Sequence, residues 1–163
     1  MKATFICIVT CWHVIQAQLQ PILVPPPRDN HGFAESNDVL YLFGGYNGGK
    51  GYNDLYQMDP STELWADLST KVQGTPPSPR GSHGFASCGN MLYVFGGYGT
   101  NVGLLNDLHQ LDTNTFTWTD LTSTALGKAP SPRYDHGFSC AGGKLFVFGG
   151  VDDKNPALND VFR

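Results

Sequence analysis

The sequence has few charged residues and no excess of basic ones. Asp and Glu number 14 against 10 Lys and Arg, the formal net charge is −4, and charged residues make up 15% of the chain. The basic residues are scattered singly along the sequence. Nucleic acids and anionic membranes attract clustered Lys and Arg. We therefore expect neither as a partner.

The short motifs of common enzymes are also missing. The sequence contains no Gly-x-Ser-x-Gly elbow, no His-Glu-x-x-His, no phosphate-binding Gly-x-x-x-x-Gly-Lys and no Cys-x-x-Cys. We therefore predict a protein that is not an enzyme, with no catalytic residues, no cofactor and no metal.

Glycine and proline are plentiful, with 20 Gly and 11 Pro in 163 residues, and 40% of the residues are hydrophobic. This composition is typical of a folded β-rich domain with many turns, and the length allows one domain at most.

A multi-part motif repeats along the chain with a period of 52 or 53 residues. Each copy contains Pro-Arg, then His-Gly-Phe, an apolar run, a glycine doublet, a polar loop, Asn-Asp and, in two copies, a Trp. The markers are Arg28, Arg80 and Arg133; His31, His83 and His136; the doublets at 44–45, 96–97 and 149–150; Asp54, Asp107 and Asp160; and Trp65 and Trp118. A period of about 50 residues built from short strands indicates propeller blades.

The apolar runs at 39–43, 91–95 and 145–148 do not alternate with polar residues, which predicts strands covered on both faces. Each glycine doublet should let the backbone bend out of its strand. Asp59 and Asp112 then predict tight turns before an outer strand that carries the Trp.

On these motifs the sequence resembles the kelch-repeat family, from residue 25 to residue 163. The resemblance implies an all-β fold of kelch-type β-propeller blades, each of four antiparallel strands. The repeats span about 25–75, 76–128 and 129–163, which makes an incomplete ring of about two and a half blades. Because such a piece cannot close, we expect either a fragment of a longer protein, which we favour, or self-association of two chains into a six-bladed ring.

The resemblance implies a non-catalytic scaffold for protein–protein interaction, with a protein partner of unknown identity. The alternative from another class is a fragment of an extracellular carbohydrate-active or galactose-oxidase-like propeller enzyme. A purely architectural module is a third interpretation.

Residues present in every copy are expected to serve the blade. Zinc needs ligands that converge on one point, whereas ring geometry separates equivalent positions. We therefore predict that the repeated His side chains are structural and hydrogen-bond a neighbouring strand, and that the repeated Arg side chains are structural too.

The loops after the glycine doublets differ between copies, and loops on a rigid β scaffold commonly carry recognition. The first loop offers Tyr46, Lys50 and Tyr52, and the second offers Tyr98 and Asn101. The third offers Asp152, Asp153 and Lys154. We predict these eight as binding residues; the alternative is that the loops only connect strands.

Residues 1–17 differ from the rest. Lys2, an apolar stretch that ends at Ile15, and Ala17 fit a secretory signal peptide, which predicts a secreted domain at 18–163. Alternatively, Trp12 precedes Arg28 by 16 residues, close to the 15 from Trp65 to Arg80, so this stretch could be the outer strand of a preceding blade in a cytoplasmic protein.

Cys88 and Cys140 lie in equivalent strands of neighbouring repeats. They stand 5 and 4 residues after their respective His residues, so they should point to opposite faces of their strands. This spacing leaves a disulfide open but does not predict one.

Overall fold

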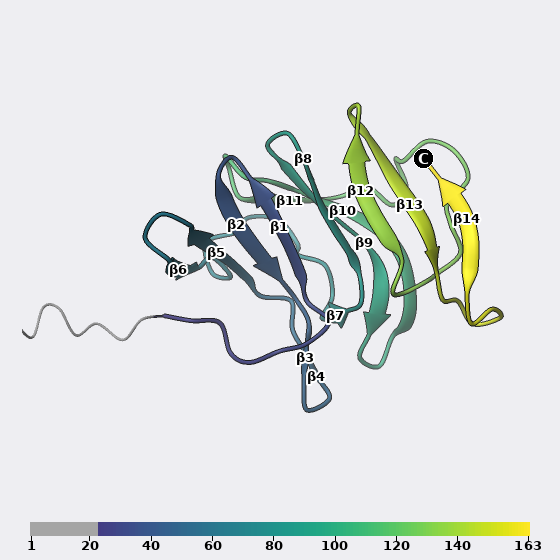
Figure 1. Cartoon of the computed structure of the whole chain (residues 1–163), viewed down its shortest axis with the longest axis horizontal. Coiled ribbons are helices and arrows are strands. Elements are labelled where there is room, and N and C mark those ends of the chain that lie inside the picture. Colours follow the sequence, from purple (N-terminus) through teal and green to yellow (C-terminus); the bar gives the residue numbers. More distant parts are fainter. Residues whose placement is uncertain (1–22) are drawn as a thin grey trace, which may run out of the picture.

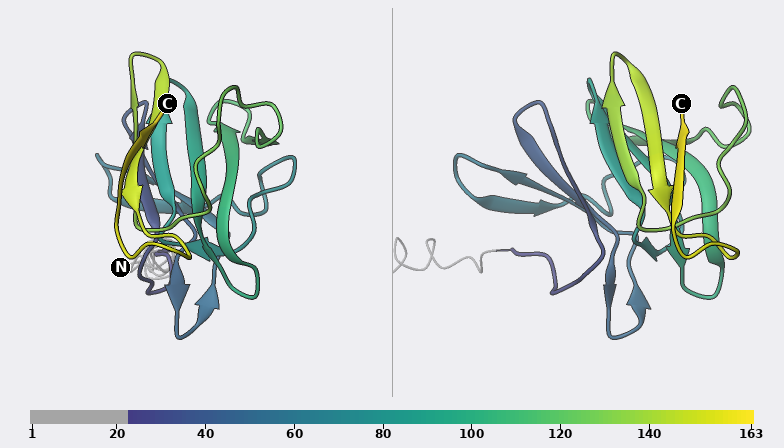
Figure 2. Two further views of the ribbon diagram at one scale, coloured as in Figure 1. Left: turned by 90° about the vertical axis from the view of Figure 1, so that its right-hand side faces the viewer. Right: turned by 45° about the vertical axis from the view of Figure 1, so that its right-hand side comes forward.

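Three antiparallel sheets follow one another along residues 23–163, the part of the chain that this computed structural model describes (Figure 1). Every helix or strand element in this part is a β-strand, which confirms the all-β prediction. We call the sheets blades 1, 2 and 3. Their planes lie side by side and fan out as an open arc, with blade 2 in the middle (Figure 2).

Blades 1 and 2 have the predicted four antiparallel strands. Blade 1 consists of β1 (Gly32–Ser36), β2 (Val39–Phe43), β5 (Leu55–Asp59) and β6 (Leu64–Asp67), and a small hairpin of β3 (Tyr46–Asn47) and β4 (Lys50–Gly51) extends from it. Blade 2 consists of β8 (Gly84–Cys88), β9 (Met91–Gly99), β10 (Gly103–Asp112) and β11 (Thr117–Asp120), with β7 (Arg80–Gly81) paired to the end of β9. Blade 3 has three strands, β12 (Gly137–Ala141), β13 (Lys144–Gly150) and β14 (Leu158–Phe162).

β2 ends directly before its glycine doublet and β13 ends at the second glycine of its doublet, whereas β9 continues past its doublet to Gly99. All six glycines of the doublets have a positive φ, so the backbone is distorted there as predicted, but in blade 2 the strand does not end at the doublet. An irregularity in the pairing of β9 with β10, between Leu105 and Leu108, absorbs the distortion and lets Gly97 pair with Leu105. Gly97 has φ +95°, and a methyl group on it would lie 2.7 Å from the carbonyl oxygen of Gly81. Glycine is required there for both reasons.

The apolar core lies between blades 1 and 2. It contains the buried side chains of Tyr41, Phe43, Leu55, Leu68, Leu92, Val94, Leu111 and Trp118. The indole of Trp118 lies 5.2 Å, between ring centroids, from the ring of Phe43 on the neighbouring blade. Each such buried side chain stabilises the fold by about 1.5–3 kcal/mol, so most of the stability comes from contacts between blades.

The phenylalanine that precedes each glycine doublet is buried in blades 1 and 2 but exposed in blade 3. Phe43 in blade 1 is 0% exposed and Phe95 in blade 2 is 4% exposed, because the next blade covers each of them. Their counterpart in blade 3, Phe148, is 56% exposed. The outward face of blade 3 is therefore uncovered in the structure.

A disulfide joins Cys88 of β8 to Cys140 of β12, with the two Cα atoms 5.5 Å apart. The two cysteines do point to opposite faces of their strands. However, Cys140 lies on the same face of β12 as Phe138, which packs on Phe95 of blade 2, while Cys88 lies on the face of β8 that adjoins blade 3. Since adjoining blades meet through opposite faces, the offset that argued against a disulfide is what brings the two sulfur atoms together.

Both interpretations of residues 1–17 lie outside the described residues. In residues 23–163 no helix is long and apolar enough to span a membrane.

Candidate functional site

Three loops lie along the same side of the three blades. Each joins the second strand of a blade to the third, and they are the segments at 44–54, 99–103 and 151–157 (Figure 1). All eight predicted binding residues lie on these loops or directly beside them. We call this side of the molecule the loop face.

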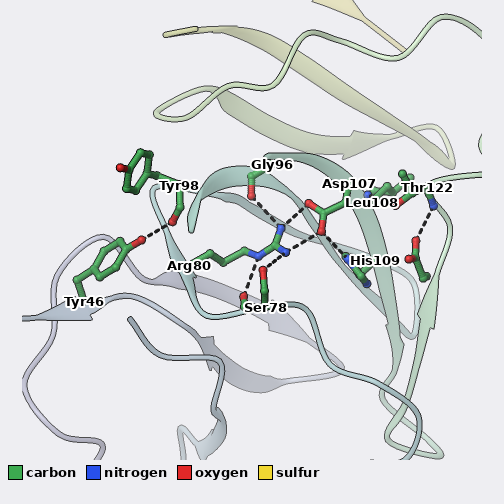
Figure 3. A network of polar contacts seen from close by, with 10 residues as sticks. Tyr46, Ser78, Arg80, Gly96, Tyr98, Asp107, Leu108, His109 and Thr122 are labelled. Carbon is green, nitrogen blue, oxygen red and sulfur yellow. Dashed lines mark hydrogen bonds and ion pairs between the residues drawn. The ribbon is translucent and has the colours of Figure 1, made fainter. Parts of the chain in front are cut away.

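A buried arginine supports the loop of blade 2 (Figure 3). The side chain of Arg80 is 0% exposed. Its guanidinium donates two hydrogen bonds to the carboxylate of Asp107, at 2.6 and 2.7 Å, and a third to the carbonyl oxygen of Gly96, at 3.0 Å. Gly96 lies in β9 and Asp107 lies in β10, so one side chain ties together the two strands that enter and leave the loop.

The same clamp occurs in every blade. Arg28 binds Asp54 and the Gly44 carbonyl, and Arg133 binds Asp160 and the Gly149 carbonyl. The predicted structural role of the repeated arginines is confirmed. Their aspartate partners were not predicted, although the Asp residues repeat with the same period as the Arg residues.

Asp107 is ionised because of its partners. Burial alone would raise its pKa, but hydrogen bonds from Arg80 and His109 outweigh this effect and hold the pKa of Asp107 well below its ordinary value. The Nε2 atom of His109 lies 2.8 Å from the carboxylate. Arg80 and Asp107 therefore form an ion pair at neutral pH.

His83 and His136 lie between blades and pack against aromatic rings. His83 packs edge-on against Phe43 of blade 1, and His136 does the same against Phe95 of blade 2. Neither ring nitrogen of His83 has a hydrogen-bond partner among the described residues, so the predicted hydrogen bond to a neighbouring strand is wrong for His83. Burial, and then the positive charge of Arg80, lower the pKa of His83 to about 3. Burial and the charge of Arg133 lower the pKa of His136 to about 4.

Backbone hydrogen bonds connect the segments that precede the first strands of neighbouring blades, β1, β8 and β12. The amide of Ser82 donates to the carbonyl of Asn30, and the amide of Asp135 donates to the carbonyl of Ser82, at 2.9 and 3.0 Å. These three residues occupy equivalent positions and share a φ of +52° to +53°. These bonds join each blade to the next along the arc.

Tyr46, on the loop of blade 1, contacts blade 2. Its hydroxyl donates a hydrogen bond to the carbonyl oxygen of Tyr98, and its ring packs so closely on Gly81 that a methyl group there would lie 2.5 Å from a ring carbon (Figure 3). The side chain is half-buried. It thus joins the loops of blades 1 and 2 and supports Tyr98.

Tyr52 is braced as well. The Arg28 guanidinium carbon lies 4.4 Å from the Tyr52 ring centroid, and the Lys50 ammonium lies 5.2 Å from the same centroid. The Tyr52 carbonyl accepts a hydrogen bond from the amide of Arg80. Of this group, only Lys50 is fully exposed.

The loop of blade 2 carries the most accessible apolar surface of the loop face. Tyr98 is 49% exposed, and Asn101 is exposed with φ +66°. Val102, between Asn101 and Gly103, is 62% exposed. Val102 was not among the predicted binding residues, because these were chosen for aromatic and polar character. Its position in a variable loop could have indicated it.

In the loop of blade 3, Asp152 has a structural role. One carboxylate oxygen accepts hydrogen bonds from the amides of Lys154 and Asn155, and the other accepts one from the hydroxyl of Ser131. These bonds, that from the Lys154 amide first, lower the pKa of Asp152. Asp153 and Lys154 are exposed.

The structure therefore divides the candidates into two groups. Tyr46, Tyr52 and Asp152 build the loops, whereas Lys50, Tyr98, Asn101, Asp153 and Lys154 are exposed on them, together with Val102. Within residues 23–163 no three His, Cys, Asp or Glu side chains are placed to hold a metal ion. An exposed set of aromatic, apolar, amide and charged groups is suited to contact a macromolecular surface.

Comparison with known proteins finds a matching family model and several similar proteins with kelch in their names. A family model described as the KLHDC2/KLHL20/DRC7 Kelch-repeats domain matches residues 5–163. The human Rab9 effector protein with kelch motifs is 41% identical over 117 residues, which cover 70% of this chain and 30% of that protein. The Kelch domain-containing protein 3 of Bos taurus is 35% identical over 140 residues, which cover 85% of this chain and 36% of that protein.

One relative carries an enzyme name. A probable serine/threonine-protein kinase of Dictyostelium discoideum is 41% identical over 130 residues, which cover 77% of this chain but only 10% of that protein. The chain thus spans between a tenth and just over a third of the length of these three relatives.

Proposed function

Because this chain belongs to the kelch-repeat family, we propose that it is a non-catalytic module that binds a protein partner through its loop face. The observation that carries the proposal is that buried side chains hold the loops in place while other side chains of the same loops are exposed. Buried arginine clamps fix each loop at both ends, while Tyr98 and Val102 are held out in solvent. Large apolar side chains on a preorganised scaffold lose little conformational entropy on binding.

The names of relatives support a protein as the ligand. The human relative is described as an effector of Rab9, which is itself a protein–protein relation. The identity of the partner of this chain stays open to experiment. The alternative of a carbohydrate-active or galactose-oxidase-like propeller enzyme stays a prediction, and the kinase name does not transfer to a chain that matches a tenth of that protein.

Site-specific photo-crosslinking tests the proposal. A photoreactive amino acid would replace Tyr98 or Val102, and a control would carry it at Thr119, an exposed residue of the outer strand β11. We expect the two loop positions to crosslink the same protein from a cell extract and the control to crosslink none of it.

The crosslinked protein would then be purified and titrated against the unlabelled chain. We expect Tyr98→Ala and Val102→Asp to weaken binding at least about tenfold, which corresponds to about 1.4 kcal/mol. Equal crosslinking from the outer strand, or full affinity in both variants, would show that the loop face is not the binding surface.

The compartment in which this occurs also stays a prediction. A signal peptide at residues 1–17 would give a secreted module that begins at residue 18, and the outer-strand interpretation would give a cytoplasmic one. Sequencing the N-terminus of the protein isolated from its natural source distinguishes the two.

A further inference from the structure

The hairpin of β3 and β4 extends away from the blades, and its tip packs on nothing else (Figures 1 and 2). The turn is Gly48-Gly49, with φ +56° and +84°, and the paired residues Asn47 and Lys50 flank it. Positive φ at both central residues is the type I′ geometry of a two-residue hairpin. All four residues are exposed, and a methyl group on either glycine would meet no atom within 4 Å beyond its chain neighbours. The turn is therefore held only by its two strands.

Asn47 and Gly48 form the one Asn-Gly pair in the 163-residue sequence. In such a pair the backbone nitrogen of the glycine can attack the side-chain carbonyl carbon of the asparagine. Glycine permits this attack because it has no Cβ atom to crowd the nitrogen and because its backbone reaches conformations closed to other residues. The exposed hairpin tip thus carries the sequence that is most open to this reaction.

The reaction replaces the amide of Asn47 by an acid in two steps. A bond forms between the Gly48 nitrogen and the Cγ atom of Asn47, the bond from Cγ to the amide nitrogen breaks, and ammonia leaves with the proton of the Gly48 nitrogen. Water then opens the five-membered imide at either of its two carbonyl groups. One opening gives aspartate at position 47, and the other gives isoaspartate, in which the main chain runs through the former side chain. Water is the only co-reactant.

The side chain of Asn47 is unrestrained, whereas the repeated asparagines are held. The amide of Asn53 donates to the carbonyl of Pro77 and that of Asn106 donates to the carbonyl of Pro130, at 3.3 Å each. Within residues 23–163 the amide of Asn47 has no hydrogen-bond partner. Its Cγ atom can therefore turn toward the next backbone nitrogen without breaking a hydrogen bond.

The two products should affect the loop differently. Aspartate at position 47 places a negative charge opposite Lys50, its cross-strand partner, and opposite charges stabilise such a pair. Isoaspartate adds one carbon atom to the main chain of a hairpin that has only two paired positions, so the register is lost. Tyr46 directly precedes this position, and its hydroxyl donates to the carbonyl of Tyr98. Isoaspartate should therefore loosen the contact between the loops of blades 1 and 2.

We propose that Asn47-Gly48 is a site of spontaneous conversion to aspartate and isoaspartate, and that the isoaspartate form releases the loop of blade 1 from Tyr98. Because ammonia is lost, the fraction of converted chains increases with the age of the protein. The consequence for binding rests on the proposed function of the loop face: a partner that contacts Tyr98 binds the isoaspartate form more weakly.

Peptide mapping by mass spectrometry of the full chain, incubated in a mildly alkaline buffer, tests the modification. We expect the peptide with Asn47 to gain the mass that separates an acid from an amide several-fold faster than the peptides with Asn37 and Asn101. These two are internal controls, since both are exposed with a positive φ but are followed by Asp38 and the β-branched Val102. An isoaspartate-specific carboxyl methyltransferase with radiolabelled S-adenosylmethionine should label the incubated wild type. Asn47→Gln should lose most of this label, because the longer side chain would have to close a six-membered ring.

Hydrogen exchange tests the effect on the loop without any partner. The amides of Tyr46 and Tyr52 donate to the carbonyls of Asp29 and Gly45, both at 2.9 Å. We expect the peptides that contain these amides to exchange several-fold faster in the incubated wild type than in the fresh protein. The same peptides of Asn47→Gln should be unchanged by the incubation.

Conversion at Asn37 or Asn101 as fast as at Asn47, or an incubated wild type without isoaspartate, would overturn the modification site. Unchanged exchange in the converted chain would overturn its effect on the loop. Neither measurement involves the partner, so both are distinct from a failure of the crosslinking experiment, which would concern the proposed function alone.

Discussion

Acidification should destabilise this protein through a histidine that is buried without a hydrogen-bond partner. His83 is neutral in the folded state, since its pKa is lowered to about 3 by burial and by Arg80. In the unfolded chain its pKa is the ordinary value of about 6.5. Between these two values the unfolded state binds a proton that the folded state does not bind. Stability is therefore unaffected above about pH 7 and falls as the pH drops through about 6.5.

The magnitude follows from the two pKa values. From about pH 7 to about pH 5, protonation of His83 stabilises the unfolded chain by the equivalent of about 1.4 pH units. Each pH unit corresponds to about 1.36 kcal/mol. His83 alone should then cost about 2 kcal/mol of unfolding free energy over this range. His136, whose pKa is lowered to about 4, should add a comparable cost. The arginines lower the pKa of Asp107 and Asp160 further below this range, so these two carboxylates do not obscure the effect.

Urea unfolding of the full chain at about pH 7, 6 and 5, at one protein concentration and followed by tryptophan fluorescence, measures this dependence. In His83→Phe the unfolding free energy should fall by about 2 kcal/mol less than in the wild type over the same range. Thr119→Ala, at an exposed position of β11, is the control, because it removes no titratable group. A wild-type stability that does not change between pH 7 and 5, or an unchanged slope in His83→Phe, would refute the reasoning.

Three further predictions concern the clamp, the disulfide and the glycine doublet. Arg80→Met should destabilise the chain by about 3–5 kcal/mol in urea unfolding, because it leaves the half-buried Asp107 carboxylate without its partner, and an effect below about 1 kcal/mol would contradict the clamp. Cys140→Ser should lower stability by up to about 4 kcal/mol under oxidising conditions, from the entropy of closing a loop of this length, and should have no effect relative to the wild type once both are reduced; a free thiol at Cys88 in the oxidised wild type would contradict the pairing. Gly97→Ala should cost several times the effect of an ordinary surface substitution of about 0.5 kcal/mol, since its φ of +95° and the nearby Gly81 carbonyl both exclude a methyl group, and a melting temperature equal to that of the wild type would contradict this.

The strand order, the number of blades and the structural role of the arginines could be predicted because the motif occurs three times in the sequence. Repetition turns a weak local signal into a fixed period, and period decides architecture. The partner of each arginine was within reach of the same argument, since Arg80 and Asp107 repeat together, but only coordinates show that the two side chains meet.

What could not be predicted depends on which face of one blade meets which face of the next. The disulfide was not predicted because the offset of Cys88 and Cys140 was analysed within a single strand, whereas the contact forms between two blades. His83 was expected to find a hydrogen bond, but the ring lies against phenylalanine. Tyr46 looked like a contact residue because tyrosine is common in binding loops, yet its hydroxyl is engaged by Tyr98.

The arginine clamp separates the folding of a blade from the content of its loop. The distance along the chain from the first glycine of the doublet to the clamped aspartate is 54 − 44 = 10 residues in blade 1 and 107 − 96 = 11 in blade 2. Since the ends are fixed, doubling the length of such a loop costs only about 0.6 kcal/mol in closure entropy. Each loop is thus a position where new sequence can be inserted, by evolution or by an engineer, while the arginine below it keeps the strands paired.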